Sequence, residues 1–310
     1  MTDMTALNRL YGIIFEDYLN DPAVTDFHVQ PPAYGERTCL RGIRKRGVMT
    51  EVGSVSADDV LTFLSRLATF NGKEFGEERP RLNARLPTGQ RLHANFERMT
   101  SGPTFSVRQP SREVITLPML VKWEMISGTD ADRLRGCLED GDNILISGNP
   151  GAGKTTLLRA LCHEATIRDG RAVIAQDPNE FEIPGTWVLH LEADEDGENP
   201  VTLSDCISDS LRKDTESLVI GEVRNRKAAE DMVTGFNTVA RTIGTIHAKS
   251  AHRAPSRVAN LTKADEYGRR ELAEFINVVV HVTRDHRSDA RRVEAIERIA
   301  GYRDNAFQFA

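Results

Sequence analysis

The chain has 310 residues, of which 39% are hydrophobic and 28% charged, so it is long enough for two domains with a substantial core. Its net charge of -6 and pI near 5.8 argue against broad, non-specific binding to nucleic acid. No run approaches 18 consecutive apolar residues and the first residues do not form a signal peptide, so we expect any membrane association to be peripheral or through partners.

The first 112 residues predict a small α+β domain. Apolar side chains recur at helical spacing in residues 1–20, up to Asn20-Asp21-Pro22, and the pattern returns in residues 58–71. The segment Leu-Pro-Thr-Gly-Gln at 86–90 is typical of a hairpin turn. Short extended runs, each typical of a strand, lie at 26–30, 38–41, 47–49, 82–86, 91–96 and 104–108.

A second domain is expected at 121–310, after a linker at 113–120 that is rich in turn-forming residues. Apolar runs alternate there with helical patterns, which predicts an α/β fold with a mainly parallel sheet flanked by helices. Only residues 285–290 separate the last two runs, so we expect an antiparallel hairpin there. The predicted strands are 143–147, 172–175, 188–191, 217–220, 242–246, 278–283 and 292–299.

Cysteines and basic clusters suggest no special chemistry by themselves. The four cysteines contain no Cys-x-x-Cys pair, so neither a zinc site nor a disulfide framework is indicated, and we expect reduced thiols in a cytosolic protein. Basic residues gather at 41–46 and 284–292, a pattern typical of a solvated face or of a local binding patch.

Residues 148–156 read Gly-Asn-Pro-Gly-Ala-Gly-Lys-Thr-Thr and fit G-x-x-x-x-G-K-[S/T], the pattern of a phosphate-binding loop. An apolar run typical of a buried parallel strand precedes the loop. A helical apolar stripe follows it and ends near Asp169-Gly170. Strand, loop and helix are therefore in the required order, and the dipole at the helix N-terminus would favour an anion.

The loop predicts a site for ATP and Mg²⁺. Its glycines allow a tight turn with successive N–H groups directed at an anion. Lys154 is expected to reach the β- and γ-phosphates, and the hydroxyl of Thr155 to ligate Mg²⁺. The expected nucleotide-binding residues are Gly148, Asn149, Pro150, Gly151, Ala152, Gly153, Lys154, Thr155 and Thr156.

Three predicted strands end in ionisable residues at the edge that carries this loop, which is where open parallel sheets bind ligands. Glu222 is the first candidate to orient or deprotonate an attacking water. The residue before it, Gly221, has no side chain that could bind a metal, so we do not expect direct Mg²⁺ ligation from that strand. Glu180 is either a ligand of Mg²⁺ and its waters, an auxiliary base, or an exposed acid on a turn. His247 either contacts the γ-phosphate or is a hydrogen-bonded histidine at a strand end.

Four segments together resemble the secretion and pilus traffic ATPases, the superfamily that powers type IV secretion, conjugative transfer and type IV pili. They are the loop at 148–156, Asp-Pro-Asn-Glu-Phe at 177–181, Leu211-Arg212 with Leu-Val-Ile-Gly-Glu-Val-Arg at 218–224, and Gly-Thr-Ile-His-Ala-Lys-Ser-Ala at 244–251. Segments 25–29 and 82–93 also match, so the likeness covers nearly the whole chain.

The resemblance implies a RecA-like P-loop NTPase domain preceded by a smaller, PAS-like α+β domain. It implies a hexameric ring at the cytoplasmic side of the inner membrane, held there by secretion or conjugation components, with ATP bound between the two domains. It implies that Glu180 and Thr155 hold Mg²⁺, that Glu222 is the catalytic carboxylate and that His247 senses the γ-phosphate. Arginines of the N-terminal domain would reach the triphosphate, with Arg91, Arg98 and Arg108 in the matching stretch.

Departures from the family pattern favour the type IV secretion or conjugation branch over pilus assembly or retraction. Gln176 and Asn225 stand where Glu and Asp are usual. The Ala-Glu-x-Gly-His segment and the four-cysteine zinc module of pilus and type II secretion ATPases are both missing.

Two other functions stay open. A RecA-like nucleic-acid motor would need basic, aromatic-lined contacts, whereas only 6% of the residues are aromatic, and no sequence-specific nucleic-acid binding is expected. A nucleotide-dependent assembly scaffold would bind ATP without hydrolysing it.

Overall fold

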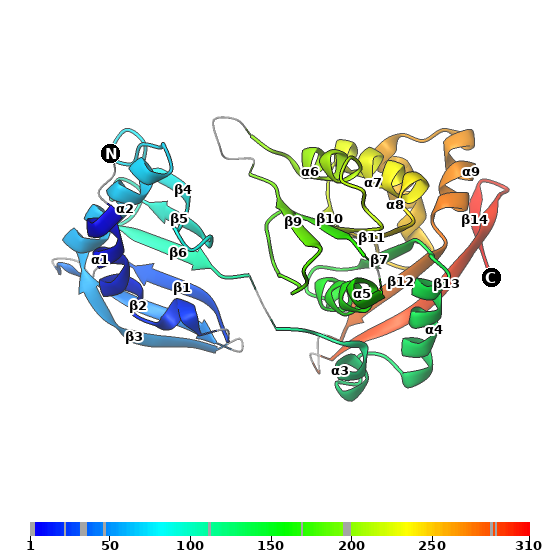
Figure 1. The fold of residues 1–310 in the computed structure, drawn as a ribbon, viewed down its shortest axis with the longest axis horizontal. Coiled ribbons are helices and arrows are strands. Elements are labelled where there is room, and N and C mark those ends of the chain that lie inside the picture. Colours follow the sequence, from blue (N-terminus) through cyan, green and yellow to red (C-terminus); the bar gives the residue numbers. More distant parts are fainter. Residues whose placement is uncertain are drawn as a thin grey trace. The chain divides into compact units, whose positions relative to one another are not determined.

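The structure is a computed structural model that describes residues 4–21, 23–31, 36–45, 48–110, 113–168, 170–194, 200–285, 288 and 290–310. It divides the chain into two compact units, Met1–Glu113 and Val114–Ala310 (Figure 1). The expected boundaries at residues 22, 47, 112 and 169 fall outside the described residues.

Among its described residues, the first unit forms a six-stranded sheet in which every pair of neighbours is antiparallel. Two helices, α1 (Met4–Phe15) and α2 (Ala57–Phe70), share one apolar core with this sheet. The strands lie in the order β3 (Val48–Ser56), β2 (Thr38–Lys45), β1 (Val24–Gln30), β6 (Thr104–Arg108), β5 (Arg91–Asn95) and β4 (Arg81–Arg85).

Alternation along the central strands of this unit explains why one face is buried. Phe27 of β1 and Phe105 of β6 point to the core, whereas their sequence neighbours are polar and more exposed. Phe15 of α1 lies among them, with ring centroids 4.9 Å from Phe27, 5.7 Å from Phe105 and 5.6 Å from Phe63 of α2. These fully buried rings join both helices to the middle of the sheet.

Most predicted elements of the first unit are confirmed, and one is shorter than expected. The turn at 86–90 closes the β4–β5 hairpin, with the amide of Leu86 donating to the carbonyl of Gln90 at 2.8 Å. The first helix was expected to run to residue 20 but ends at Phe15, because Glu16 adopts a left-handed φ of +48°. A short 3₁₀ helix, Tyr18–Asn20, follows.

In the part of the second unit that the structure describes, eight strands form one mainly parallel sheet. The order is β14 (Ala306–Phe309), β13 (Arg291–Arg303), β12 (Val278–Arg284), β7 (Ile144–Gly148), β11 (Arg241–Ile246), β10 (Ser217–Val223), β8 (Ala172–Gln176) and β9 (Val188–Glu192). All pairs from β12 to β9 are parallel, and β12–β13 is the expected antiparallel hairpin. The prediction of a mainly parallel α/β sheet is confirmed, and β14 was not predicted.

Helices cover both faces of this sheet (Figure 1). Along β7, Ile144 and Ile146 belong to the core shared with α3 to α5, whereas Leu145 belongs to the core shared with α6 to α9. Strands buried on both faces read as continuous apolar runs, as these do. The helices are α3 (Leu117–Lys122), α4 (Gly128–Glu139), α5 (Lys154–Arg168), α6 (Leu203–Ser210), α7 (Arg226–Thr238), α8 (Arg253–Thr262) and α9 (Glu266–Phe275).

Helix α3 begins at Leu117, inside the stretch expected to be a linker.

All four cysteines are free and buried. Among the described residues, no helix combines the length and the apolar character needed to cross a membrane.

Candidate functional site

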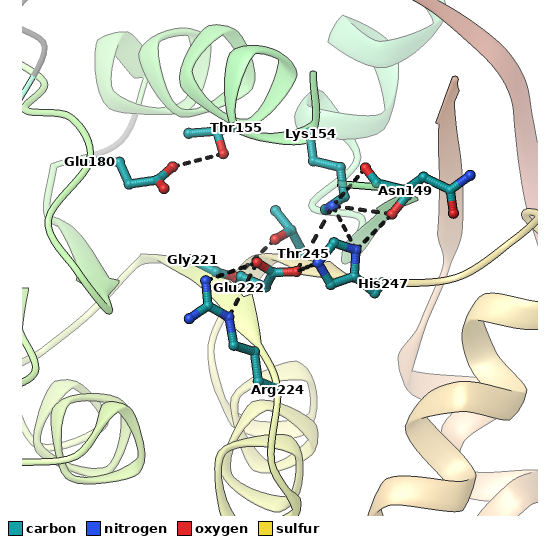
Figure 2. A network of polar contacts seen from close by, with 10 residues as sticks. Asn149, Lys154, Thr155, Glu180, Gly221, Glu222, Arg224, Thr245 and His247 are labelled. Carbon is teal, nitrogen blue, oxygen red and sulfur yellow. Dashed lines mark hydrogen bonds and ion pairs between the residues drawn. The ribbon is translucent and has the colours of Figure 1, made fainter. Parts of the chain in front are cut away.

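The phosphate-loop pattern lies between β7 and α5, at the carboxyl edge of the parallel strands. A cavity of about 390 Å³ opens there. Thr155, Glu180, Glu222 and His247, from four different segments, line it together with the loop. The predicted convergence of these side chains on one sheet edge is therefore present in the structure (Figure 2).

The backbone of the loop requires glycine at defined positions. Gly148 pairs with Val282 of β12, and a Cβ at Gly148 would collide with the carbonyl oxygen of Val282. Gly151 and Gly153 have left-handed φ values of +72° and +102°, which other residues rarely adopt. The loop thus forms the tight cradle that an anion-binding nest requires.

Lys154 lies under this loop with only 8% of its side chain exposed. Its Nζ donates to the carbonyls of Gly148 at 3.1 Å and Asn149 at 3.2 Å, and it lies 3.1 Å from Nδ1 of His247. Burial lowers the pKa of Lys154, and the carboxylates of Glu222 and Glu180 oppose this effect. A phosphate entering the cavity would supply further negative charge to this buried ammonium.

Thr155 and Glu180 meet on the other side of the cavity (Figure 2). The Thr155 hydroxyl donates to Oε2 of Glu180 at 3.0 Å. A hydroxyl and a carboxylate beside an anion cradle are the hard oxygen donors that Mg²⁺ takes, with phosphate and water completing its shell. The Thr155 and Glu180 side chains supply two such oxygen donors. Among the described residues, no group of three or more His, Cys, Asp or Glu side chains is gathered for a metal.

Gln176, the last residue of β8, shapes the segment that carries Glu180. Its Oε1 accepts from the amide of Glu180 at 3.1 Å, and its Nε2 donates to the carbonyl of Phe181 at 2.9 Å. The side chain is almost fully buried. Sequence reasoning treated Gln176 only as a departure from the family pattern and missed this role.

Glu222 is brought to the cavity by an irregularity in β10. The register between β10 and β11 shifts between Ile220 and Glu222, and the Thr245 hydroxyl donates to the carbonyl of Gly221 at 3.1 Å. Such a bulge re-aims the next side chain. Glu222 Oε1 is buried and contacts Nε2 of His247, with Nζ of Lys154 3.9 Å away.

The two ring nitrogens of His247 connect the loop to the carboxylate. Nδ1 lies 3.1 Å from Nζ of Lys154 and also 3.1 Å from the carbonyl oxygen of Gly148. Nε2 faces the carboxylate of Glu222. Arg224 holds the other carboxylate oxygen of Glu222, with Nη2 at 3.1 Å and Nε at 3.3 Å. Lysine, histidine, carboxylate and arginine thus form one continuous chain (Figure 2).

The predicted arginines of the first unit occupy two places. Arg91 and Arg108 pair directly across β5 and β6, and Arg85 is the next residue in that row. Arg98 follows the far end of β5, where its guanidinium donates to the carbonyl of Glu77 at 3.5 Å. The structure therefore brings Arg91 and Arg108 together and leaves Arg98 outside that row. Their reach to a triphosphate stays a prediction.

Arg291 is another cavity residue that sequence reasoning did not assign to the site. Arg291, the first residue of β13, lines the cavity, and its Nε donates to the carbonyl of Gly151 at 3.1 Å. The basic run at 284–292 was the signal, but a local run cannot show that a hairpin brings it against a loop 140 residues earlier.

Comparisons with known proteins identify related sequences and folds. The family described as "Type II/IV secretion system protein" matches residues 2–307. The conjugal transfer protein TrbB of Rhizobium radiobacter is 28% identical over 241 residues, covering 76% of this chain and 72% of that protein. The type IV secretion system protein VirB11 of Brucella suis biovar 1 is 24% identical over 322 residues, covering 90% and 88%. The pilus retraction motor PilT, solved with ADP, shares the fold with a TM-score of 0.61 at 14% identity, covering 100% of this chain and 82% of that one.

Proposed function

The chain belongs to the type II/IV secretion system protein family, and from this premise we propose that it is a Mg²⁺-dependent ATPase that powers a type IV secretion or conjugative transfer machine. The names of the relatives TrbB and VirB11 support this branch over pilus dynamics. We propose that Val114–Ala310 is a RecA-like P-loop domain and that the protein works as a hexameric ring at the cytoplasmic side of the inner membrane, docked on membrane components of the machine.

The observation that carries the proposal is the meeting of Lys154, His247 and Glu222 beside the loop. In hydrolysis, Lys154 and the loop amides hold the β- and γ-phosphates. Thr155 and Glu180 hold Mg²⁺, which when bound neutralises phosphate charge. Lys154, Thr155 and Glu180 all line the same cavity, which supports this assignment.

Glu222 is proposed to orient the attacking water and to accept its proton. Its Oε2 is held by Arg224, so the carboxylate is fixed in orientation while Oε1 faces His247. His247 bridges Glu222 and Lys154 and is therefore placed to report γ-phosphate binding at Lys154 to the catalytic carboxylate.

Arginines of the first unit are proposed to complete the site by stabilising charge on the transferred phosphoryl group. The cross-strand pair of Arg91 and Arg108 supports these two as the principal candidates, because both guanidinium groups come from one row on one sheet. Arg98 is the third candidate, and its position beyond β5 makes it the weakest of the three.

The proposal is tested by phosphate release from the purified full chain with ATP and Mg²⁺. Lys154→Ala and Glu222→Gln are expected to lower turnover by about a hundredfold or more, and chelation of Mg²⁺ by EDTA to abolish it. Glu230→Gln is the matched control, since Glu230 pairs with Arg226 on the outside of α7.

The outcomes separate the alternatives. Full turnover in Lys154→Ala would contradict the site assignment. ATP-dependent assembly without phosphate release would support a scaffold, and strong stimulation by DNA or RNA would support a nucleic-acid motor.

A further inference from the structure

Two arginines of the β12–β13 hairpin lie against the phosphate loop. Arg284 ends β12, Arg291 begins β13, and the strand register places them directly opposite each other. Nη1 of Arg284 lies 3.2 Å from the position that a Cβ on Gly151 would occupy. Nε of Arg291 donates to the carbonyl of the same glycine at 3.1 Å. Both guanidinium groups therefore converge on one residue of the loop.

The side chain of Arg291 is packed along the loop. Its Cδ lies 3.2 Å from the position of a Cβ on Gly153, so the missing side chain of that glycine leaves room for the arginine stem. Within the described part of the chain, the side chain of Arg291 makes one hydrogen bond, which is the bond from its Nε to the carbonyl of Gly151. Its two terminal nitrogens, with four N–H donors, are left for a partner in the cavity that Arg291 lines.

The charge arrangement indicates what that partner is. Arg291 and Lys154 both line the cavity, and the ammonium of Lys154 lies under the same loop. This side of the cavity therefore carries positive charge, which an anionic ligand complements. A planar guanidinium also binds phosphate through two parallel hydrogen bonds, which a lysine cannot do.

We infer that Arg291 binds the phosphate chain of the nucleotide, while its Nε keeps the loop in its anion-binding shape. Arg284 adds positive charge behind the loop. The inference deepens the proposed function and rests on it, since both concern the same cavity. It makes the C-terminal hairpin part of the nucleotide site and predicts that Arg291 favours ligands with two or more phosphates over a monophosphate.

The test compares Arg291→Met with Arg292→Met in the full chain. Methionine keeps the stem against Gly153 and removes the charge. Arg292 is the matched control, because it is the next residue on β13, is exposed, and points to the opposite face of the strand. Dissociation constants are measured for ADP, AMP and inorganic pyrophosphate by displacement of a fluorescent ADP analogue, and the urea midpoint is measured without ligand.

Arg291→Met is expected to raise the dissociation constants of ADP and pyrophosphate by about tenfold to a hundredfold, and that of AMP by less. Arg292→Met is expected to leave all three dissociation constants unchanged. Arg291→Lys keeps a positive charge but loses the planar guanidinium, so its affinity for ADP and pyrophosphate is expected to lie between those of the wild type and Arg291→Met. This variant also provides the test if Arg291→Met does not fold.

Three results would overturn the inference. Equal ADP affinity in the Arg291 and Arg292 variants would show that Arg291 does not contact the ligand. Equal losses for ADP and AMP with no loss for pyrophosphate would place Arg291 at the base or ribose. A lower urea midpoint with no difference among ligands would leave it a purely structural role. If the wild-type chain binds neither ADP nor pyrophosphate, the proposed function itself fails.

Discussion

At the residue scale, Gln176 shows how one side chain sets the position of a candidate metal ligand. Its carbonyl oxygen accepts from the amide of Glu180, and its amide group donates to the Phe181 carbonyl and to Oδ1 of Asn179. A glutamate, which is the usual residue of the family pattern, could make only the first of these bonds when ionised. The turn that carries Glu180 is thus built for an amide.

Gln176→Glu is expected to lower the free energy of unfolding by about 1–3 kcal/mol, because the buried Phe181 carbonyl loses its donor. The Mg²⁺ concentration for half-maximal ATP hydrolysis should also rise, since the turn that carries Glu180 loses its bonds at Asn179 and Phe181. Urea unfolding and Mg²⁺ titration measure the two effects. Gln308→Glu, at an exposed glutamine, is the control, and an unchanged Mg²⁺ requirement in Gln176→Glu would contradict the role of Gln176.

His281 is a second residue whose environment predicts a measurable effect. It is almost fully buried behind the loop, and its Nδ1 is 2.9 Å from Oγ of Ser147. Burial lowers the pKa of His281, Glu294 opposes this effect, and the charge of Lys154 adds to it. The folded state therefore takes up this proton at lower pH than the unfolded state.

Stability should consequently decrease in acid. Above a pH of about 6.5, the usual pKa of histidine, both states are neutral and the contribution of His281 is complete. As the pH falls from there toward the lowered folded pKa, the unfolded state gains a proton first, and the free energy of unfolding drops by up to about 1.4 kcal/mol per pH unit. His281→Gln should show a shallower decline in urea unfolding between pH 8 and 5. His190, whose pKa is also lowered by burial, preserves part of the slope, and identical slopes would contradict the prediction.

At the element scale, Asn143 connects the start of β7 to three other elements. Its Nδ2 donates to the carbonyls of Phe236 in α7 at 2.7 Å and Phe275 in α9 at 2.9 Å. Its Oδ1 accepts from the amide of Thr242 in β11 at 2.8 Å. One buried amide therefore aligns the two central strands with the helices on one face of the sheet, directly before the strand that carries the loop.

Asn143→Ala is expected to lower the free energy of unfolding by about 2–4 kcal/mol, because it leaves two carbonyls and one N–H group without partners in a buried place. Urea unfolding measures the loss. Asn260→Ala, at an exposed asparagine that accepts one bond from Arg269, should change stability by less than about 0.5 kcal/mol. Similar losses in the two variants would contradict the connecting role of Asn143.

At the scale of the whole molecule, each compact unit has its own apolar core, and the cavity lies entirely within Val114–Ala310. The residues proposed to bind phosphate and Mg²⁺ are therefore in one unit, whereas Arg91 and Arg108 are in the other. We therefore expect the second unit alone to bind nucleotide, whereas fast ATP hydrolysis should require both units.

A fragment of residues 114–310 is expected to bind ADP with nearly the affinity of the full chain but to hydrolyse ATP at least about a hundredfold more slowly, because it lacks the two arginines. Arg91→Ala and Arg108→Ala in the full chain should show the same separation. Arg81→Ala, on β4 but in another cross-strand row, is the control. A fragment that hydrolyses ATP as fast as the full chain would contradict the role proposed for Arg91 and Arg108.

The amino-acid pattern was enough to predict the phosphate loop, the alternation of strands and helices, and the convergence of Glu180, Glu222 and His247 on one sheet edge. These follow from short-range causes: backbone sterics at glycine, the periodicity of apolar side chains, and the rule that parallel strands end at one edge. Only the tertiary structure reveals the register shift in β10 that directs Glu222, the hydrogen bond of Gln176 to the turn, and the contact of Arg291 with the loop. These depend on strand register and on contacts between segments far apart in the chain, which no local pattern encodes.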